Sequence, residues 1–373
     1  MNDRYCRLSD AAFLSHLRTK EINKETYIST ENMIKNIGGV TVSSNLPLVK
    51  SASRYQKDDI LISNIRPYFK KIWISNRNGS CSNDILVLKS KKDFLPLFLY
   101  YALSDNNFFN YATVTSKGTK MPRGTQNAIM KYLIPALGIN EQKKIVNILH
   151  EYDKLLETNR NRIIDLEKVV DQLFKEWFVR MRFPGYENHK TKAGFPMGWN
   201  IVKIDRVIER LPFNQTYKAT ELLDEGKIIV VDQSLQEYIG FHNNEPSHMA
   251  SFETPLLLFG DHSCKFQLMT SNFSLGENII PFCSKDSKMT NDYFLYFSVH
   301  KLINTEEYKR HWSMLKSKKI ILPNIELQNK FGDIVSEIIQ LKEQLIKINK
   351  NLEKQRDLLL PRLLSGKLEV RLS

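Results

Sequence analysis

The chain has 373 residues, of which 42% are hydrophobic, and a net charge of +13. This length exceeds one ordinary hydrophobic core and suits two domains, and the composition excludes an intrinsically disordered chain. No apolar run approaches the ~20 residues that span a bilayer, and no apolar signal segment opens the chain, so we expect a cytoplasmic protein without a membrane partner. Cys6, Cys81, Cys264 and Cys283 lack the spacing of a zinc ribbon or disulfide framework and are expected to be reduced thiols.

The positive charge is concentrated in the first third of the chain. Residues 1–138 contain 20 Lys and Arg against 10 Asp and Glu, whereas residues 183–322 contain 16 of each. Residues 139–182 and 323–373 contribute only +1 and +2. This distribution favours nucleic acid as a partner of the first segment, although many basic proteins bind none.

Mixed helix and strand patterns fill residues 1–138. The stretches 58–75 and 82–89 are rich in β-branched and aromatic residues and predict strands, and 94–109 predicts a short helix. The same order returns in the second half, with predicted strands at 227–233 and 254–261 and a predicted helix at 291–303. The pattern predicts an α+β fold in which one kind of domain occurs twice.

A long internal repeat connects the two halves. Residues 134–174 align with residues 322–360, so that Gln142 meets Gln328 and a Leu-Glu-Lys tripeptide recurs in register. Upstream, FLYYAL in the first half pairs with FLYFSV in the second. Two agreements in the same order indicate a duplicated module followed by a duplicated helix.

Both copies of the repeat predict a long helix with an apolar stripe at 3-and-4 spacing, interrupted at Asn159 in the first copy and at Gln355 and Arg356 in the second. At 1.5 Å per residue each helix is roughly 60 Å long. Chain direction then predicts an antiparallel coiled coil that separates the two modules; a simple helical hairpin in a bundle is the alternative. The predicted segments are a first module at 1–138, a helix at 139–182, a linker and second module at 183–322, and a helix with a C-terminal tail at 323–373.

Catalytic motifs are missing from the sequence. It contains no GxxxxGK[ST] phosphate loop, no GxGxxG after a strand and no HExxH. The segment Asn64–Tyr68 departs from the Asn/Asp-Pro-Pro-Tyr/Phe motif of DNA methyltransferases by an Arg and an extra residue. Glu225–Lys227 and Asp286–Lys288 lack the second carboxylate of a nuclease, and His262 and Cys264 lack further metal ligands. We therefore expect a non-catalytic protein with no cofactor of its own.

A basic loop is the clearest binding signal in the first module. Residues 115–129, TSKGTKMPRGTQNAI, combine cations that suit phosphates with amide side chains that suit base edges; a solvated turn is the alternative. Further cations, interleaved with aromatic residues, flank the predicted strands. The DNA-binding candidates of this module are Arg54, Arg66, Lys70, Lys71, Lys117, Thr119, Lys120, Arg123, Thr125 and Gln126.

The second module offers weaker candidates. The stretch YKRHWSMLKSKK at 308–319 precedes the second long helix as the basic loop precedes the first, and FNQTYKATE at 213–221 is a polar loop that also contains Asn214 and Tyr217. Trp312 and Met314 are predicted to pack rather than to stack on bases. The DNA-binding candidates here are Gln215, Lys218, Lys309, Arg310, Lys316 and Lys318.

Together these motifs resemble the specificity subunit of type I restriction-modification systems. The resemblance is carried by IPALGINEQKKIVNIL and DLEKVVDQLFKEWFV in the first repeat, by GFPMGWNIVKIDRVI at 194–208, and by QRDLLLPRLLSGKLEV at 355–370. It extends over essentially the whole chain. The start departs from the family pattern, because YCRLSDAAF at 5–13 lacks the expected Gly-Trp dipeptide.

The resemblance implies that each module is a target recognition domain that binds one half of a split double-stranded DNA site. It also implies two modification subunits, which use S-adenosylmethionine to methylate adenine, and restriction subunits that use ATP and Mg. Phe174, Trp177 and Phe178 would then either dock partner helices or close the end of the helical hairpin. A coiled-coil scaffold without DNA specificity, and a specificity subunit that serves modification without restriction, remain alternatives.

Overall fold

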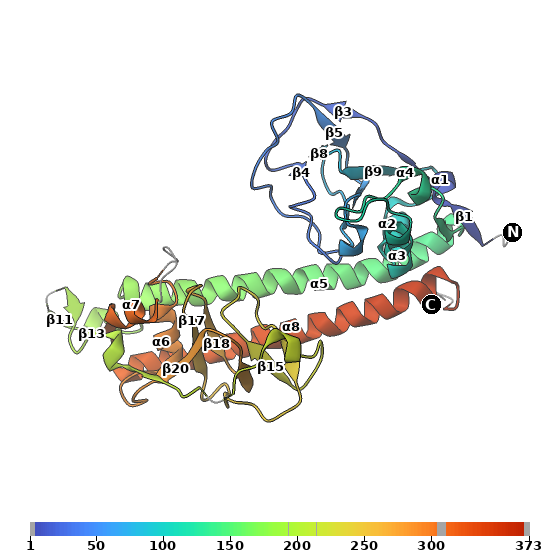
Figure 1. Cartoon of the computed structure of the whole chain (residues 1–373). Coiled ribbons are helices and arrows are strands. Elements are labelled where there is room, and N and C mark those ends of the chain that lie inside the picture. Colours follow the sequence, from blue (N-terminus) through green and yellow to red (C-terminus); the bar gives the residue numbers. More distant parts are fainter. Residues whose placement is uncertain (1–3, 193, 214, 304–310, 369–373) are drawn as a thin grey trace. The chain divides into compact units, whose positions relative to one another are not determined.

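The computed structural model describes residues 4–192, 194–213, 215–303 and 311–368 (Figure 1). The chain divides into two compact units: unit 1 comprises Met1–Thr158 and Asn349–Ser373, and unit 2 comprises Asn159–Ile348. Each unit therefore combines one α/β module with a segment of each long helix. None of the described helices is long and apolar enough to cross a membrane.

Unit 1 is built around a four-stranded antiparallel sheet with the strand order β2-β9-β6-β7. Side chains alternate across a strand, so Ile60 and Ile62 of β6 face one core with Phe98, while Leu61 faces another with Tyr55. A second sheet has the order β3-β5-β8-β4, and β1 pairs with β10. The strands are β1 (Tyr5–Arg7), β2 (Ala12–Leu14), β3 (Arg18–Thr19), β4 (Tyr27–Ile28), β5 (Ala52–Tyr55), β6 (Ile60–Ser63), β7 (Ile72–Ile74), β8 (Gly79–Cys81), β9 (Ile85–Ser90) and β10 (Leu133–Pro135).

Short helices surround these strands and refine two sequence predictions. The predicted helix at 94–109 is two helices, because Asp105 is extended and its carboxylate accepts from Asn107 N–H at 2.7 Å, which caps the second helix. The predicted strand at 58–75 is β6 and β7, because the chain turns at Arg66 and Pro67. The helices are α1 (Leu8–Ala11), η1 (Pro67–Phe69), α2 (Pro96–Ser104), α3 (Asn106–Val114) and α4 (Gln126–Ile129).

Unit 2 repeats this architecture. Its four-stranded sheet has the order β14-β20-β17-β18, which matches β2-β9-β6-β7 strand for strand, and β13 pairs with β21 as β1 pairs with β10. A three-stranded sheet has the order β16-β15-β19. The strands are β13 (Asn200–Lys203), β14 (Ile208–Arg210), β15 (Ile228–Val231), β16 (Gly240–His242), β17 (Leu256–Gly260), β18 (Phe266–Met269), β19 (Phe273–Leu275), β20 (Ile279–Ser284) and β21 (Lys319–Leu322). The remaining elements are η3 (Tyr186–Asn188), β11 (Thr191–Lys192), β12 (Phe195–Pro196), η4 (Ile204–Arg206), η5 (Ala219–Glu221), α6 (Asp292–Val299) and α7 (Trp312–Ser317).

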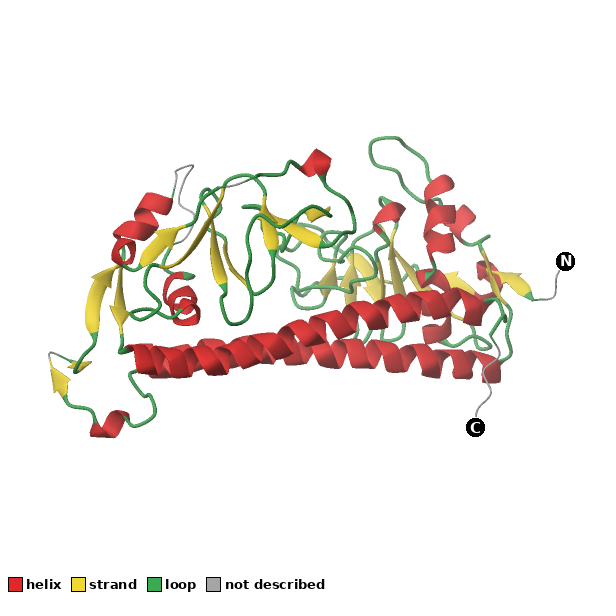
Figure 2. Cartoon of the chain, turned by 90° about the horizontal axis from the view of Figure 1, so that it is seen from below, coloured by secondary structure: helices red, strands yellow, loops and turns green. Residues whose placement is uncertain are grey.

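The two long helices are α5 (Ile139–Phe174), extended by η2 (Lys175–Val179), and α8 (Ile325–Leu364). In each unit their segments lie side by side and antiparallel (Figure 2): Arg356 Nη1 donates to Asp153 Oδ1 at 2.8 Å in unit 1, and Lys342 Nζ donates to Glu167 Oε1 at 2.6 Å in unit 2. The predicted antiparallel helix pair is confirmed. The buried stripe is narrower than the apolar pattern of the sequence, since Leu341, which keeps the 3-and-4 spacing in the second copy, is 46% exposed.

A buried glutamine near the start of each long helix binds its module in the same way. Gln142 accepts from Leu95 N–H at 2.8 Å and donates to the carbonyls of Asp93 and Leu137. Gln328 accepts from Asn291 N–H at 3.1 Å and donates to the carbonyls of Met289 and Pro323. Both side chains are fully buried. The repeat register that pairs these two glutamines in the sequence therefore holds in three dimensions.

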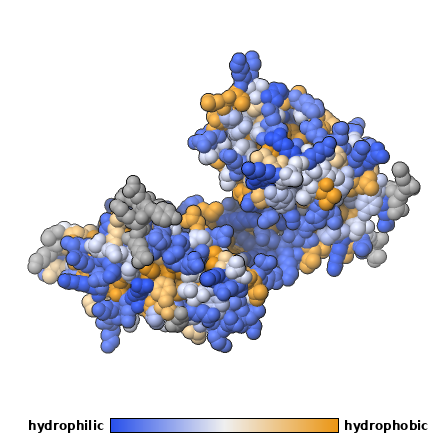
Figure 3. Space-filling model, in the orientation of Figure 1, coloured by the Kyte–Doolittle hydropathy of each residue, from blue (hydrophilic) through white to orange (hydrophobic). Residues whose placement is uncertain are grey.

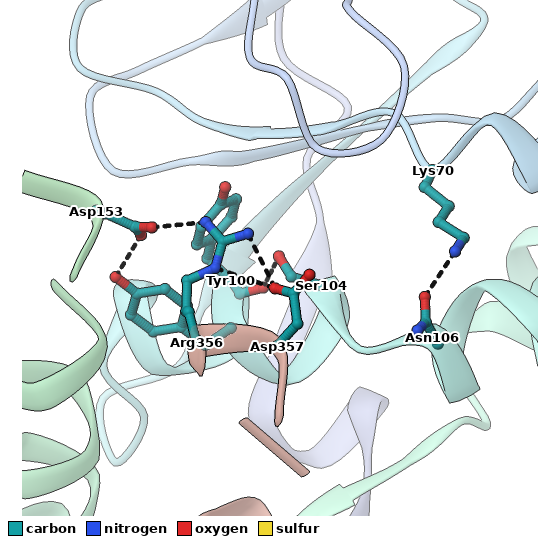
Figure 4. Close-up of polar contacts among 8 residues, drawn as sticks. Lys70, Tyr100, Ser104, Asn106, Asp153, Arg356 and Asp357 are labelled. Atoms are coloured by element: carbon teal, nitrogen blue, oxygen red, sulfur yellow. Dashed lines mark hydrogen bonds and ion pairs between the residues drawn. The ribbon is translucent and has the colours of Figure 1, made fainter. Parts of the chain in front are cut away.

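Unit 1 contains a second polar connection between its module and the helices (Figure 4). Tyr101 of α2 donates its hydroxyl hydrogen to Asp153 Oδ2 at 2.7 Å, and Arg356 binds the other oxygen of the same carboxylate. Burial, followed by the negative charge of Asp153, raises the pKa of Tyr101. Burial lowers the pKa of Arg356, but the hydrogen bond and charge of Asp153 outweigh it, so the net shift is upward.

In unit 2 the end of α5 is closed by aromatic packing instead. Trp177 and Phe178 are 7% and 5% exposed, and the ring of Phe178 lies 5.1 Å from that of Phe331 on α8 and 4.8 Å from that of Phe294 on α6. Phe174 packs against the same cluster. Of the two roles considered for these aromatic residues, closure of the hairpin end is the one the structure supports.

Candidate nucleic-acid interface

The predicted basic loop forms an exposed projection from unit 1. Lys117 and Arg123 exchange both backbone hydrogen bonds at 2.9 Å, which closes a turn over residues 118–122. Gly118 has a φ of +92°, a backbone conformation that residues other than glycine rarely adopt. Lys117, Thr119 and Lys120 are exposed. Residues 117–123, called the finger below, therefore present cations to solvent on a defined turn.

The base of the finger is held by backbone contacts to the loop after β6. Arg66 N–H donates to Pro122 O at 2.8 Å, and Gly124 N–H donates to Asn64 O at 3.0 Å. A Cβ atom at Gly124 would lie 2.8 Å from Asn64 Oδ1, so any larger residue would have to displace the Asn64 side chain. Arg123 Nη2 also lies 3.1 Å from Asp84 Oδ1. The two side chains are 57% and 35% exposed, and such a solvent-exposed ion pair contributes only about 0–1 kcal/mol to stability.

A polar groove of about 310 Å³ opens beside the finger. Its apolar wall comes from β2 and β9, and its polar side chains come from four separated parts of the chain: Ser15, His16, Arg18, Ser53, Asn83 and Gln126. Gln126 begins α4, three residues after the finger, and Asn83 precedes the Asp84 that pairs with Arg123. Finger and groove thus form one continuous surface of unit 1.

The side chains of Arg18 and Asn83 are fixed against each other in this groove. Arg18 Nη1 donates to Asn83 Oδ1 at 3.0 Å, while its Nε and Nη2 donate to the hydroxyl and carbonyl of Ser51 at 3.1 and 2.7 Å. Ser53 Oγ donates to the same Asn83 oxygen at 3.4 Å. Ser15, His16, Arg18 and Asn83 are absent from the predicted site. Arg18 and Asn83 are 65 positions apart, and no local motif marks their contact.

The other predicted residues of unit 1 lie in different environments. Arg54 is exposed on β5 next to Ser53, but successive side chains of a strand point to opposite faces. Lys70 Nζ donates to Asn106 Oδ1 at 2.7 Å (Figure 4), and Lys71 Nζ donates to Thr30 O. Burial, followed by the nearby charge of Lys35, lowers the pKa of Lys71. Thr125 precedes Gln126 and is half-buried. Among the predicted candidates, the finger residues, Arg66 and Gln126 are the ones that the structure brings together.

The corresponding scaffold recurs in unit 2. Asp261 N–H donates to Asn278 O as Asn64 N–H donates to Asp84 O, and His311 N–H donates to Asp261 O as Gly124 N–H donates to Asn64 O. The segment before α7 is therefore fastened like the end of the finger. Lys309 and Arg310, which immediately precede it, lie outside the described residues, as does Asn214.

The described candidates of unit 2 are scattered. Gln215 and Lys218 are exposed, and Lys318 is exposed near Lys316, whose Nζ lies 3.2 Å from Asp205 Oδ1. Trp312 is buried as predicted, and Met314 is 37% exposed, so it packs only in part. Tyr217 is also not an exposed loop residue: its ring stacks on His242 with centroids 4.2 Å apart. No cluster of His, Cys, Asp or Glu that could hold a metal occurs among the residues that the structure describes.

Comparisons with known proteins identify this architecture. A family model described as "Type I restriction modification DNA specificity domain" matches residues 13–168, which include the finger and the groove. The MjaIX specificity subunit of Methanocaldococcus jannaschii is 26% identical over 303 residues, which cover 73% of this chain and 69% of that protein. The MjaVIII specificity subunit of the same organism is 22% identical over 326 residues, or 79% of this chain and 76% of that protein.

The family model and these relatives together mark the chain as a type I restriction-modification specificity subunit. It is the non-catalytic subunit that recognises DNA in a restriction-modification system. A crystal structure of the S subunit from M. genitalium aligns over 100% of this specificity subunit and 98% of that chain, with a TM-score of 0.59 and 16% identity. At this identity the likeness concerns the fold, and it includes both modules and both long helices.

Proposed function

We propose that this specificity subunit binds a bipartite double-stranded DNA site with one module on each half-site, and that α5 and α8 set the unread spacer. The observation that carries the proposal is the repetition of the strand order of the four-stranded sheet in the two units, each of which includes segments of both helices. Two copies of one recognition fold suit two half-sites, because each half-site needs its own set of base contacts.

Within unit 1 the finger and the groove divide the work. Lys117, Lys120 and Arg123 hold phosphates, and the amide groups in the groove contact base edges. Arg54, Arg66, Lys70 and Lys71 add sequence-independent attraction from neighbouring surfaces. In unit 2, where charge is balanced, Gln215, Lys218, Lys309, Arg310, Lys316 and Lys318 supply fewer phosphate contacts.

Partner subunits supply the chemistry. Two modification subunits with S-adenosylmethionine methylate adenine, and restriction subunits with ATP and Mg cleave DNA, all in the cytoplasm where the DNA lies. Apolar side chains that project from α5 and α8 offer these partners a docking surface: Val169 and Leu341, both in unit 2, are 49% and 46% exposed. The buried aromatic cluster at Phe178 takes no part.

Methylation-site sequencing of a host that carries this gene with its native neighbours tests the proposal. The expected result is one methylated motif made of two short specific halves separated by a fixed number of unspecified bases. A single uninterrupted motif, or no motif that depends on this gene, would overturn the proposal.

A further inference from the structure

We propose that Asn83 is a specificity-determining residue that donates a hydrogen bond to one base, and that Arg18 positions it for this task. The inference rests on the proposed function and goes further, since it names the group that selects one position of the half-site bound by unit 1.

Arg18 determines which atom of the Asn83 amide faces the groove. The guanidinium has only donors and stays charged at any physiological pH, so the amide atom 3.0 Å from Nη1 must be the oxygen. Ser53 Oγ donates to the same oxygen at 3.4 Å. Both lone-pair directions of Asn83 Oδ1 are thus occupied by the protein, and the NH₂ group is the part left for a ligand.

The guanidinium itself cannot turn away easily. Its Nε and Nη2 donate to both oxygens of Ser51, and β3, which contains Arg18, pairs with β5 through Arg18 and Ser53. Arg18 is therefore a positioning residue, held by its hydrogen bonds to Ser51 and Asn83. Asn83, at the exposed turn between β8 and β9, is the group that it presents.

The surroundings of Asn83 suit a polar ligand. Ser15 lines the same groove, and its buried Oγ has no hydrogen-bond partner among the residues that the structure describes. Gln126 lies on the groove as well, and the finger adjoins it through the contact between Arg123 and Asp84. A base edge in the groove and the flanking phosphates on the finger would together satisfy these groups.

A donor-only amide selects for an acceptor on the base. In the major groove guanine presents two acceptors, O6 and N7, while thymine presents O4, adenine presents N7 and cytosine presents only its N4 donor; the bidentate adenine contact typical of asparagine also needs the amide oxygen to accept from N6. Because Arg18 and Ser53 occupy that oxygen, Asn83 favours guanine or thymine at its position, leaves adenine a single contact and disfavours cytosine. Asn83→Asp keeps the contact to Arg18 but replaces the donor by an acceptor, which favours cytosine N4 or adenine N6.

The test compares methylated motifs in hosts that carry the complete gene cluster with the wild-type, Asn83→Asp or Arg18→Gln subunit. We expect Asn83→Asp to change the preferred base at one position of one half-site, by on the order of tenfold to a hundredfold in site occupancy. Arg18→Gln, which frees the amide to rotate, should relax the same position. Asn107→Asp is the matched control, since it adds the same charge at an exposed position outside the groove.

The outcomes separate the inference from the proposed function. A bipartite wild-type motif that Asn83→Asp leaves unchanged overturns the inference alone, and so does a change in both half-sites. Absence of a bipartite wild-type motif overturns the proposed function as well. If Asn83→Asp abolishes methylation, Asn83→Ala decides: relaxed preference at one position supports the inference, and an unchanged motif contradicts it.

Discussion

Units 1 and 2 share a frame but differ in the surfaces built on it. Both have the same order of strands in the central sheet and the same buried glutamine at the start of a long helix. The face of unit 1 visible in Figure 3 is mainly hydrophilic, whereas apolar side chains gather on the visible face of unit 2 around α6 and β17. Duplication has preserved the contacts that orient a module on its helices and left the exposed loops free to diverge.

The glutamine contacts should be equivalent in the two units. Replacing Gln142 or Gln328 by Leu leaves one backbone N–H and two carbonyls without a partner, and each buried unsatisfied group costs about 1–3 kcal/mol. We expect each variant to lose about 2–4 kcal/mol of unfolding free energy, as measured by chemical denaturation. A large loss for one variant and none for the other would contradict the shared frame.

The ion pairs that connect α5 to the rest of each unit should contribute differently to stability. Asp153→Ala removes the partner of both Tyr101 and the largely buried Arg356, and we expect a loss of about 2–3 kcal/mol in the unfolding free energy. Asp171→Ala in unit 2 removes a contact to Lys301, whose side chain is 60% exposed, and should cost only about 0–1 kcal/mol. Equal losses of unfolding free energy in the two variants would contradict this difference between the units.

The buried carboxyl group of Asp292 in unit 2 should make the free energy of unfolding depend on pH, and unit 1 has no titratable group at the equivalent position. Burial raises the pKa of Asp292, at the start of α6, to about 6 from 3.8, against the opposing effect of the Ser284 N–H. The folded protein then binds more protons than the unfolded chain between these values, so stability falls as pH rises from about 4 to 6. The position next to the glutamine contact in unit 1 is Pro96, which does not titrate.

Asp292→Asn should therefore stabilise the protein at pH 7, by roughly 1–3 kcal/mol, and have little effect at pH 4. Thermal unfolding across this pH range measures the difference. A variant that is as pH-dependent as the wild type between pH 4 and 6 would assign the effect to another group.

The basic finger should matter for DNA affinity rather than for sequence preference. Replacing Lys117, Lys120 and Arg123 by Ala should weaken binding to all duplexes and lower the slope of log K against log salt by up to about 2.7, for three lost phosphate contacts. Exposed lysines elsewhere in unit 1, namely Lys24, Lys57 and Lys131, are the matched control triple. A selective loss on one sequence would assign the finger to base recognition instead.

Parts of this comparison were accessible from the sequence. The repeat around Gln142 and Gln328 predicts two modules and two antiparallel helices, because periodic apolar residues and a recurring motif are local signals. The contact of Arg18 with Asn83 is not predictable in this way, since it joins a strand residue to a turn residue far away in the sequence. The neighbours of Tyr217 in the sequence predict a polar loop, but its position opposite His242 depends on the sheet.

The length of the helices offers an independent test of the division into two readers. Four residues inserted into both helices, near Asn159 in α5 and near Lys347 in α8, add about 6 Å at 1.5 Å per residue. We expect the unread spacer in the methylated motif to lengthen while both half-sites stay the same. A constant spacer would contradict the role of α5 and α8 as a ruler.

The most direct test of the central claim, that each module binds one half-site, is methylation-site sequencing with Gln126→Ala. Gln126 lies in the groove of unit 1, so we expect relaxed base preference in one half-site and an unchanged second half-site and spacer. Relaxation of both half-sites to a similar extent would contradict it.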